Sequence, residues 1–499
     1  MFAVTLTEML AAEAAAMASG CTEERLLDHA GERLGLAIGR FFQNPGTLTG
    51  YLGKGHNAAD TLVALRILRD QFGWEIATRN AFPIDHCAPL TQKKWRQLGL
   101  IAPLEAPPDW RDLKTPHVLL DGLLGSGSQG ALAGPLLSLA QEMEWFRQHT
   151  GARVAAVDSP SGIDMHTGLA SPGSVVADIT FMIGNAKSCL LESSAANSTG
   201  ALALVPVEVL TACGTSGLRL IAPQTMDFAK SPRPFDFHKG TAGRVAVLAG
   251  SSRYPGAAVL AAIGALRGGA GLITLHVPAQ AAAVIAARCP PEIIVRAYAS
   301  LRELLDFNDC NAWVIGCGLG DLDSSSAAAL LDLLTQASAP AVIDADALNL
   351  IARSGKIRIL TDRHVVTPHP AEFQRLAPDL AGIARELAAR AFVNRSPATL
   401  LLKGCRSLVT RCGQALYCNA TGNPGMATGG QGDLLAGVMG ARLATGQSPV
   451  EAAALAAWLC GRAAEIALHD RFVSEESLTP SEVADHLGAA YHDWKTSGR

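Results

Sequence analysis

Residues 423–437 read NPGMATGGQGDLLAG, and this stretch decides the fold predicted for the C-terminal half. Its glycines, Gly429, Gly430 and Gly432, let the backbone approach a ligand closely. The apolar run after Asp433 predicts a helix, whose free N–H groups and dipole attract an anion. Asp433 can then take a proton from a hydroxyl that attacks a phosphate, so we predict a general base beside an anion cradle. A turn that Asp433 merely caps is the structural alternative.

The composition of the chain indicates a large α/β protein. With 499 residues the length predicts two to four domains, and we expect two. The content of 49% hydrophobic and only 5% aromatic residues favours α/β packing rich in alanine, leucine and valine. A net charge of -4 without long charged runs argues against a nucleic-acid or membrane partner. The eleven cysteines contain no CxxC pair, so we expect the reducing cytoplasm and neither a disulfide framework nor a zinc site.

Strand and helix patterns alternate in both halves, which predicts parallel sheets with crossover helices. A Gly-, Ser- and Pro-rich segment near 211–237 interrupts this rhythm, and we place the boundary there. The expected organisation is an N-terminal Rossmann-like domain over 1–215, a linker over 216–234 and a C-terminal domain over 235–499. The apolar stretches 256–275 and 452–468 contain charged residues and are predicted to be core helices.

Several further motifs in the second half follow predicted strands. Glycines, a pair of carboxylates, a histidine between prolines and a lysine would meet at the carboxyl ends of these strands. His369 is predicted to bind a ligand because Pro368 and Pro370 fix its loop, and Lys403 is predicted to meet phosphates as a point charge. The motifs are HKGTAGRV at 238–245, YPGAA at 254–258, GCGLGD at 316–321, DADALN at 344–349, TPHPAEF at 367–373 and LLKGCRS at 401–407.

Together with NPGMATGGQGD, these motifs resemble the ADP-dependent NAD(P)HX dehydratase family over about residues 235–490. The resemblance implies a fold of the ribokinase superfamily and the restoration of NADH or NADPH from its hydrated form. A nucleotide phosphate would activate the ring hydroxyl as a leaving group, with ADP as donor and Mg²⁺ beside it. The family usually has the motif GGSGD. This chain has GGQGD instead, with Gln431 in the place of the serine.

The resemblance also implies roles for particular residues of this half. Asp433 would be catalytic and would face the substrate hydroxyl. Three further residues would contact the hydrated nicotinamide substrate, namely Ala257, Gly318 and His369. The nucleotide would be held by Lys403, Gly404, Cys405, Arg406, Ser407 and Gly432.

Three loops of the first half each follow a predicted strand. They are GKGHNAAD at 53–60, DGLLGSG at 121–127 and VDSPSGID at 157–164. Because carboxyl ends of parallel strands share one sheet edge, these loops are predicted to form a pocket, although each aspartate could also simply cap its loop.

The first half resembles the NAD(P)HX epimerase family over about residues 3–210. The resemblance lies in these loops, the helical pattern from Leu6 to Gly31 and the stretch Gly184–Lys187. Interconversion of the two epimers of the hydrate would let the dehydratase recover all damaged cofactor. The resemblance implies Asp158 as an acid/base residue and a potassium ion held by Asn57, Asp121 and Ser161. The other implied substrate contacts are His56, Asn57, Ala58, Ala59, Asp60, Gly125, Ser126, Gly127, Ser128, Gln129, Gly130 and Ala131.

Two alternatives stay open from the sequence. A ribokinase-like kinase for a small alcohol would share Gly432 and Asp433, but TPHPAEF and the long NPGMATGG lead-in favour the dehydratase. The N-terminal half could instead be a binding module, since the family's NNGGDG is HNAADT here. We expect a bifunctional enzyme that acts on small molecules and forms a homo-oligomer.

Overall fold

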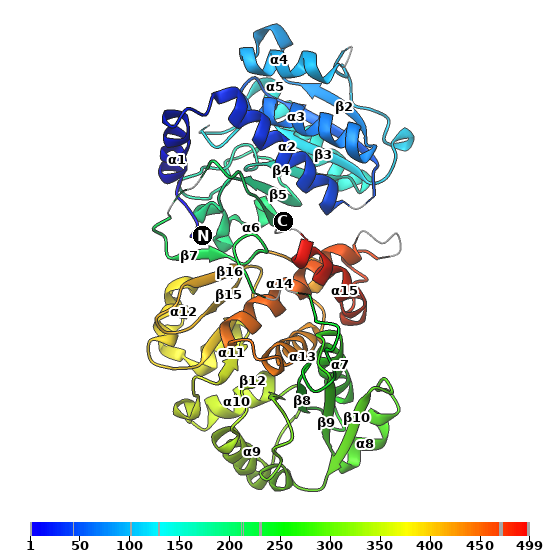
Figure 1. Ribbon diagram of the computed structural model, residues 1–499, viewed down its shortest axis with the longest axis vertical. Coiled ribbons are helices and arrows are strands. Elements are labelled where there is room, and N and C mark those ends of the chain that lie inside the picture. The colour runs from blue at the N-terminus through cyan, green and yellow to red at the C-terminus, as the bar shows by residue number, and fades with distance from the viewer. Residues whose placement is uncertain are drawn as a thin grey trace. The chain divides into compact units, whose positions relative to one another are not determined.

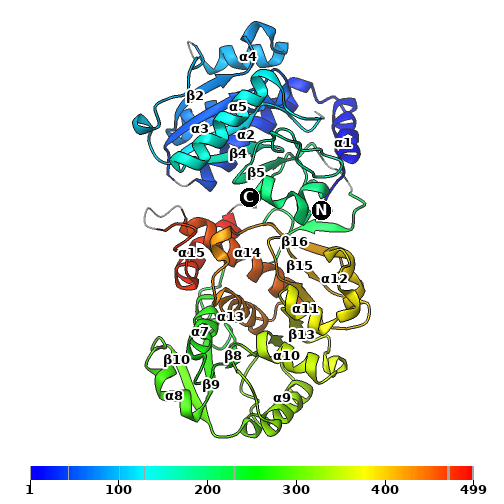
Figure 2. The same ribbon diagram turned by 180° about the vertical axis from the view of Figure 1, so that it is seen from behind.

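The computed structural model describes residues 2–42, 44–99, 102–127, 130–210, 212, 214–228, 232–468 and 473–496. The chain divides into two compact units, Met1–Leu220 and Ile221–Arg499. The division falls inside the stretch predicted as a linker, 216–234. Part of that stretch is not a free connection, because Ile221 and Met226 are buried in the core of the second unit. Figures 1 and 2 show both units from opposite sides.

The N-terminal unit is built on a wholly parallel sheet with the strand order β2-β1-β3-β4-β5-β6. The strands are β1 (Thr47–Leu52), β2 (Glu75–Asn80), β3 (His117–Gly122), β4 (Arg153–Val157), β5 (Ile179–Ile183) and β6 (Ala201–Val205). The main helices are α1 (Leu6–Ala18), α2 (Glu23–Phe41), α3 (His56–Phe72), α4 (Pro89–Leu98) and α5 (Gly134–Thr150).

Both faces of this sheet are covered by helices, as the apolar runs of its strands require. Successive side chains of β3 point to opposite faces. Val118 and Leu120 join a core cluster with residues of α2 and α3, whereas Leu119 packs with residues of α5. The two views accordingly show α2 and α3 on one side of the sheet and α5 on the other (Figures 1 and 2). The carboxyl ends of the strands therefore remain at one open edge.

The C-terminal unit carries a larger, mostly parallel sheet in the order β10-β9-β8-β11-β12-β13-β14-β15-β16. Only the β14–β15–β16 end is antiparallel. The strands are β8 (Arg244–Leu248), β9 (Leu272–Pro278), β10 (Ile293–Tyr298), β11 (Ala312–Ile315), β12 (Ala341–Ile343), β13 (His364–Val366), β14 (Thr399–Leu402), β15 (Ser407–Thr410) and β16 (Leu416–Asn419). The helices are α7 (Pro255–Arg267), α8 (Ala279–Ala286), α9 (Ser324–Gln336), α10 (Ala345–Arg353), α11 (Pro370–Leu376), α12 (Arg385–Val393), α13 (Gln431–Ala444), α14 (Pro449–Ala467) and α15 (Pro480–Thr496).

Two glycines allow α13 to lie directly against α7. A side-chain carbon on Gly264 would lie 2.3 Å from the Leu434 carbonyl oxygen, and one on Gly437 would lie 2.0 Å from the Ala261 carbonyl oxygen. Both distances are far inside van der Waals contact, so only glycine permits this approach. The motif at 429–433 is thus fixed to the rest of the unit by the backbone of its own helix.

The apolar stretch 452–468 lies almost wholly in α14, which is buried on all sides, as predicted for a core helix. Its charged Arg462 is paired with Glu465 at 3.0 Å and with Asp493 at 2.8 Å. No helix among the described residues is long and apolar enough to cross a membrane. Two α/β units on mainly parallel sheets confirm the predicted fold class.

Candidate active sites

The glycine-rich stretch of the C-terminal unit forms the start of α13. Gly430 precedes the helix in the left-handed conformation with φ of 97°, which turns the chain into the helix. A side-chain carbon on Gly432 would lie 3.3 Å from Lys403 Nζ and 3.5 Å from Asp344 Oδ2. A side chain at this position would therefore contact both charged groups, and glycine keeps the helix start free of one.

Lys403 reaches this space from the end of β14. Its Nζ donates to Asp344 Oδ1 at 2.8 Å and lies 4.0 Å from Glu372 Oε2. Burial acts to lower the pKa of Lys403, but the charge and hydrogen bond of Asp344, with Glu372, outweigh burial and raise it. Lys403 is therefore charged when a phosphate arrives.

Asp433 sits in the first turn of α13 beside the same charges. Burial and then the nearby Asp344 carboxylate raise its pKa to about 7, against the opposite effects of the Cys317 thiol and Lys403. A carboxyl group with a pKa near neutrality can both accept and return a proton at physiological pH. The arrangement therefore suits a general base.

The residues predicted to contact substrate surround this point. Gly318, with φ of 64°, follows β11, and a side-chain carbon there would lie 2.6 Å from the Cβ of Ala257. His369 caps α11, and its Nδ1 accepts from the backbone N–H groups of Ala371 and Glu372 at 3.2 and 3.4 Å. Nε2 is thus the protonated nitrogen, 3.4 Å from Glu372 Oε1, on a half-exposed ring.

The predicted nucleotide segment 404–407 is the turn between β14 and β15. Ser407 Oγ donates to the Gly404 carbonyl at 2.9 Å, which closes the turn, and Gly404 and Cys405 are exposed. Arg406 differs, because it is only 3% exposed and its Nη1 donates to the Ala420 carbonyl at 3.5 Å. Its side chain is turned into the unit, so this arrangement gives it no surface on which to hold a nucleotide.

In the N-terminal unit the three residues predicted to bind potassium come together. Asp121 is fully buried, and its carboxylate accepts from Ser161 Oγ at 2.7 Å and from Ser161 N at 2.8 Å. Asn57 Nδ2 donates to the Leu124 carbonyl at 2.9 Å, and Ser161 Oγ lies 3.4 Å from that oxygen. Burial raises the pKa of Asp121 to about 6 despite these hydrogen bonds. Carboxylate, amide, hydroxyl and carbonyl oxygens form a donor set that fits a hard cation.

Asp158 follows β4 in a strained conformation with φ of 66°. Its Oδ1 pairs with the ammonium of Lys187 and accepts from Ile183 N at 3.0 Å. Lys187 is only 2% exposed and also donates to the Ile183 carbonyl at 2.6 Å. The structure thus holds Asp158 in one orientation at the sheet edge where the other loops end.

The predicted substrate loops of this unit divide into an exposed and a buried part. His56 is exposed and lies 3.1 Å from Glu23, and the loop 125–131 is exposed or partly exposed where it is described. Ser128 and Gln129 lie outside the described residues. Ala58 and Ala59 have no exposed surface and pack in the core of α3, so their side chains do not face a ligand.

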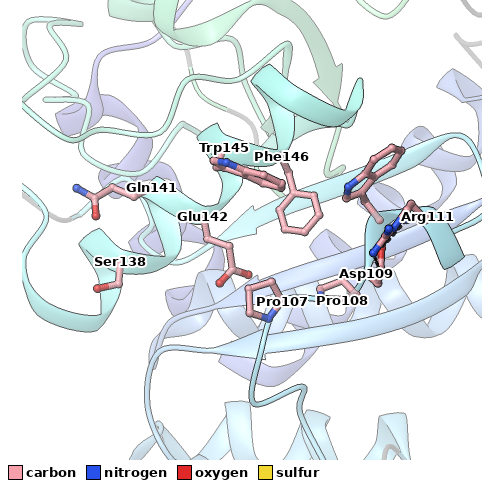
Figure 3. A pocket seen from close by; sticks show the side chains of 10 residues that line it. Pro107, Pro108, Asp109, Arg111, Ser138, Gln141, Glu142, Trp145 and Phe146 are labelled. Atoms are coloured by element: carbon pink, nitrogen blue, oxygen red, sulfur yellow. Dashed lines mark hydrogen bonds and ion pairs between the residues drawn. The ribbon is translucent and has the colours of Figure 1, made fainter.

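Elsewhere on the N-terminal unit, a pocket of 660 Å³ lies between α5 and the segment 107–111 (Figure 3). Trp145 and Phe146 form one side, Pro107 and Pro108 another, and Glu142 lies between them. None of the predicted site residues lines it.

Comparisons with known proteins agree with both halves. A sequence profile described as NAD(P)H-hydrate dehydratase matches residues 245–487, and one described as YjeF-related protein N-terminus matches residues 23–189. A bifunctional NAD(P)H-hydrate repair enzyme from Gloeobacter violaceus is 35% identical over 481 residues, which are 91% of this chain and 91% of that protein. This chain belongs to the bifunctional NAD(P)H-hydrate repair enzymes. The family membership confirms both resemblances found in the sequence.

Two solved structures resemble part of this family member. A ribokinase-like superfamily protein from Enterococcus faecalis V583 is 26% identical, with a TM-score of 0.49, and covers 57% of this chain and 99% of its own. An ADP/ATP-dependent NAD(P)H-hydrate dehydratase from Bacillus subtilis, co-crystallized with ATP/Mg²⁺, is 28% identical, with a TM-score of 0.45 and coverages of 53% and 94%.

Three charged side chains of the repair-enzyme sites received no role from the sequence. Asp344 and Glu372 hold Lys403, and Lys187 holds Asp158. Asp344 and Glu372 stand in the motifs DADALN and TPHPAEF, which follow the neighbouring strands β12 and β13. The position of both motifs after strands indicated that these side chains would lie close together. Lys187 ends the stretch Gly184–Lys187, which was part of the epimerase resemblance, but that stretch did not predict the pairing of Lys187 with Asp158.

Proposed function

We propose that this chain repairs hydrated nicotinamide cofactors in two reactions. The C-terminal unit would dehydrate the S epimer of hydrated NADH or NADPH at the expense of ADP, and the N-terminal unit would interconvert the R and S epimers. One observation carries the first part, namely Asp433 with a pKa of about 7 beside Lys403 and the glycine cradle. Membership in the bifunctional family supports both parts.

In the dehydratase reaction, Asp433 would take the proton from the ring hydroxyl as that oxygen attacks the terminal phosphate of the nucleotide. Lys403 and the N–H groups at the start of α13 would bind the charge on the phosphate. AMP leaves as the bond between the terminal phosphorus and its bridging oxygen breaks. Phosphate then leaves the ring carbon far more easily than hydroxide would, the neighbouring ring carbon gives up a proton, and the new C=C bond restores the dihydropyridine ring. Ala257, Gly318 and His369 would hold the ring, and Gly404, Cys405, Ser407 and Gly432 would hold the nucleotide.

Magnesium and potassium fit the residues that are present. Asp344 and Glu372 are oxygen donors beside Lys403, and they suit Mg²⁺ held mainly by nucleotide phosphates. Asn57, Asp121 and Ser161, with the Leu124 carbonyl, would hold K⁺ and so orient the loops around the substrate phosphates. No group of three or more histidine, cysteine or acidic side chains placed to hold a metal occurs among the described residues.

In the epimerase reaction, Asp158 would act as an acid/base residue, oriented by Lys187. His56, Asn57 and Asp60 would contact the substrate, with Gly125, Ser126, Gly127, Gly130 and Ala131 beside its phosphates. We further propose a cytoplasmic location, on the cysteine pattern of the sequence, and a homo-oligomeric assembly.

The experiment that tests this proposal follows the recovery of NADH absorbance from its hydrate with ADP and, separately, with ATP. We expect recovery with ADP, continuing past the S fraction until both epimers are consumed. Recovery that stops once the S epimer is consumed would support the dehydratase activity and contradict the proposed epimerase activity. A stable phosphate ester in place of NADH would favour the kinase alternative instead.

A further inference from the structure

Two carboxyl groups of the N-terminal unit lie in opposite surroundings. Asp158 has the Lys187 ammonium and the Ile183 N–H group as partners. Asp60 Oδ1, in contrast, is buried and has no hydrogen-bond partner in the described part of the chain. A buried carboxylate oxygen without a partner is costly, whereas a protonated carboxyl carries no charge to desolvate. Carboxyl groups that differ in this way commonly divide the roles of acid and base.

The packing around Asp60 explains its burial. Helix α2 lies against α3 at this level, where a side-chain carbon on Gly31 would lie 2.8 Å from the Asp60 carbonyl oxygen. Three carboxylates act electrostatically on Asp60, namely Asp158, Glu13 and Asp28. Burial first, and then these carboxylates, raise the pKa of Asp60 well above its usual value. Asp28 is itself paired with Lys94 at 2.7 Å.

Glu13 reaches the same place from α1. Met9 lies one turn earlier on that helix, where its sulfur is 3.8 Å from Asn185 Nδ2, next to the segment that carries Lys187. Glu13 is therefore on the face of α1 that looks toward Lys187. Burial and then Asp158 raise the pKa of Glu13, while Lys187 and His56 act in the opposite direction.

The Lys187 ammonium thus pairs with Asp158 and acts to lower the pKa of Glu13, whereas Asp60 Oδ1 is buried without a hydrogen-bond partner among the described residues. We propose that Asp60, whose buried Oδ1 has no hydrogen-bond partner among the described residues, is a general acid of the epimerase reaction and works together with the Lys187-paired Asp158. The inference rests on the proposed epimerase function. It assigns to Asp60 a chemical role beyond contact with the substrate.

The step balances between the two groups. Asp60 gives its proton to the ring hydroxyl, the carbon–oxygen bond breaks, and water leaves while the ring nitrogen's electron pair forms a C=N bond. Water then adds to the opposite face of that carbon and gives a proton to Asp158. The reverse direction uses protonated Asp158 as acid and Asp60 as base, so the two groups exchange roles between the epimers.

The test compares Asp60→Asn with Asp70→Asn in the full chain. Asp70 lies on the same helix, but it is exposed and bonded to Arg69 at 2.7 Å. We expect Asp60→Asn to lower kcat for epimerisation by about 10²–10⁴-fold with a smaller change in KM, because the amide keeps the shape but cannot give up a proton. Asp70→Asn should keep the wild-type rate.

A second readout does not depend on activity. A carboxyl whose pKa is raised in the folded state contributes stability that is lost as pH rises from its usual value toward the folded value. Asp60→Asn should therefore raise the midpoint of thermal unfolding more at about pH 8 than at about pH 5. Asp70→Asn should not, since its pKa is lowered by Arg69. Glu13→Gln removes one of the carboxylates that act on Asp60, so the alkaline fall of the epimerisation rate should move to lower pH.

The outcomes separate the inference from the function on which it rests. A wild-type chain that shows no epimerisation above the spontaneous rate overturns the proposed function and the acid role together. A normal kcat for Asp60→Asn in an active background overturns the acid role alone. So does an Asp60→Asn chain whose midpoint rises no more at alkaline than at acid pH.

Discussion

The loops that begin α3 and α13 follow the same plan but differ in their glycines. In α13 the left-handed Gly430 and the bare Gly432 keep the helix start open toward Lys403 and Asp344. In α3 the corresponding space is filled, because Ala58 and Ala59 lie inside the helix with no exposed surface. Side-chain carbons at these positions stabilise the helix but exclude close backbone contact with a phosphate. The comparison supports the proposal that one unit binds an anion through bare backbone, whereas the other would use its remaining side chains and loop 125–131.

The largest expected effect concerns the base at the open helix start. Asp433→Asn should lower the ADP-dependent recovery of NADH by about 10²–10⁴-fold, because the amide accepts no proton. Nucleotide binding, measured by calorimetry, should stay close to that of the wild type. Asp321→Asn, an exposed aspartate in the same unit, is the matched control. A near-normal recovery rate in Asp433→Asn would remove this residue from the role of base.

The second prediction concerns the cation that the cradle faces. Lys403→Met should raise the KM for ADP by about 10–100-fold. This factor corresponds to the free energy that a hydrogen bond to a charged group usually contributes. The same change leaves Asp344 and Asp433 without their ammonium, so kcat should also fall. Lys356→Met, on the turn after α10, serves as control. An unchanged KM for ADP would show that backbone groups alone bind the nucleotide.

The pH dependence of the two reactions should differ between the units. As the proposed base, Asp433 would be active when ionised, and its pKa of about 7 means that dehydration should fall as pH drops below neutrality. Below that pKa the rate should decrease about tenfold per pH unit. Epimerisation should instead fall toward alkaline pH, where Asp60 loses its proton. Parallel profiles for both reactions would contradict the difference between the sites.

The smallest effect is expected where the two loops are made alike. Ala58→Gly should destabilise the chain by about 1 kcal/mol, since glycine is a poorer helix former than alanine. It should lower the midpoint of thermal unfolding without a large loss of epimerase activity. Gly432→Ala is the reciprocal change, and its added carbon at 3.3 Å from Lys403 Nζ should weaken ADP binding while the chain stays folded. If both variants changed only the stability of the chain, and by equal amounts, the two loops would not differ in how they bind a phosphate.

Much of the fold was predictable because local patterns are strong in this chain. The alternation of short apolar runs with helical stretches predicted parallel sheets with crossover helices in both halves, and both units have such a sheet. The stretch predicted as a linker was less accurate, since Ile221 and Met226 pack into the second unit. Composition marks such a segment as irregular, but it does not reveal that two apolar side chains in it find a core.

The site was predictable where a motif carries its own geometry. Asp433, Gly432 and Lys403 could be proposed because a strand end or a helix start fixes where each must lie. Arg406 could not be judged in this way, since its neighbours in the turn are exposed and it is not. The direction of a single side chain in a tight turn depends on tertiary packing, which cannot be read from the sequence.

By itself, the sequence determined the two α/β units, the glycine-rich turn before α13 and the family, because periodicity, glycines and motif spacing are local properties. Only the tertiary structure decided which charges meet. It brought Asp344 and Glu372 to Lys403, and Lys187 to Asp158. These groups are distant along the chain, and their pKa values depend on burial and mutual distance, which exist only after the sheets and helices have packed.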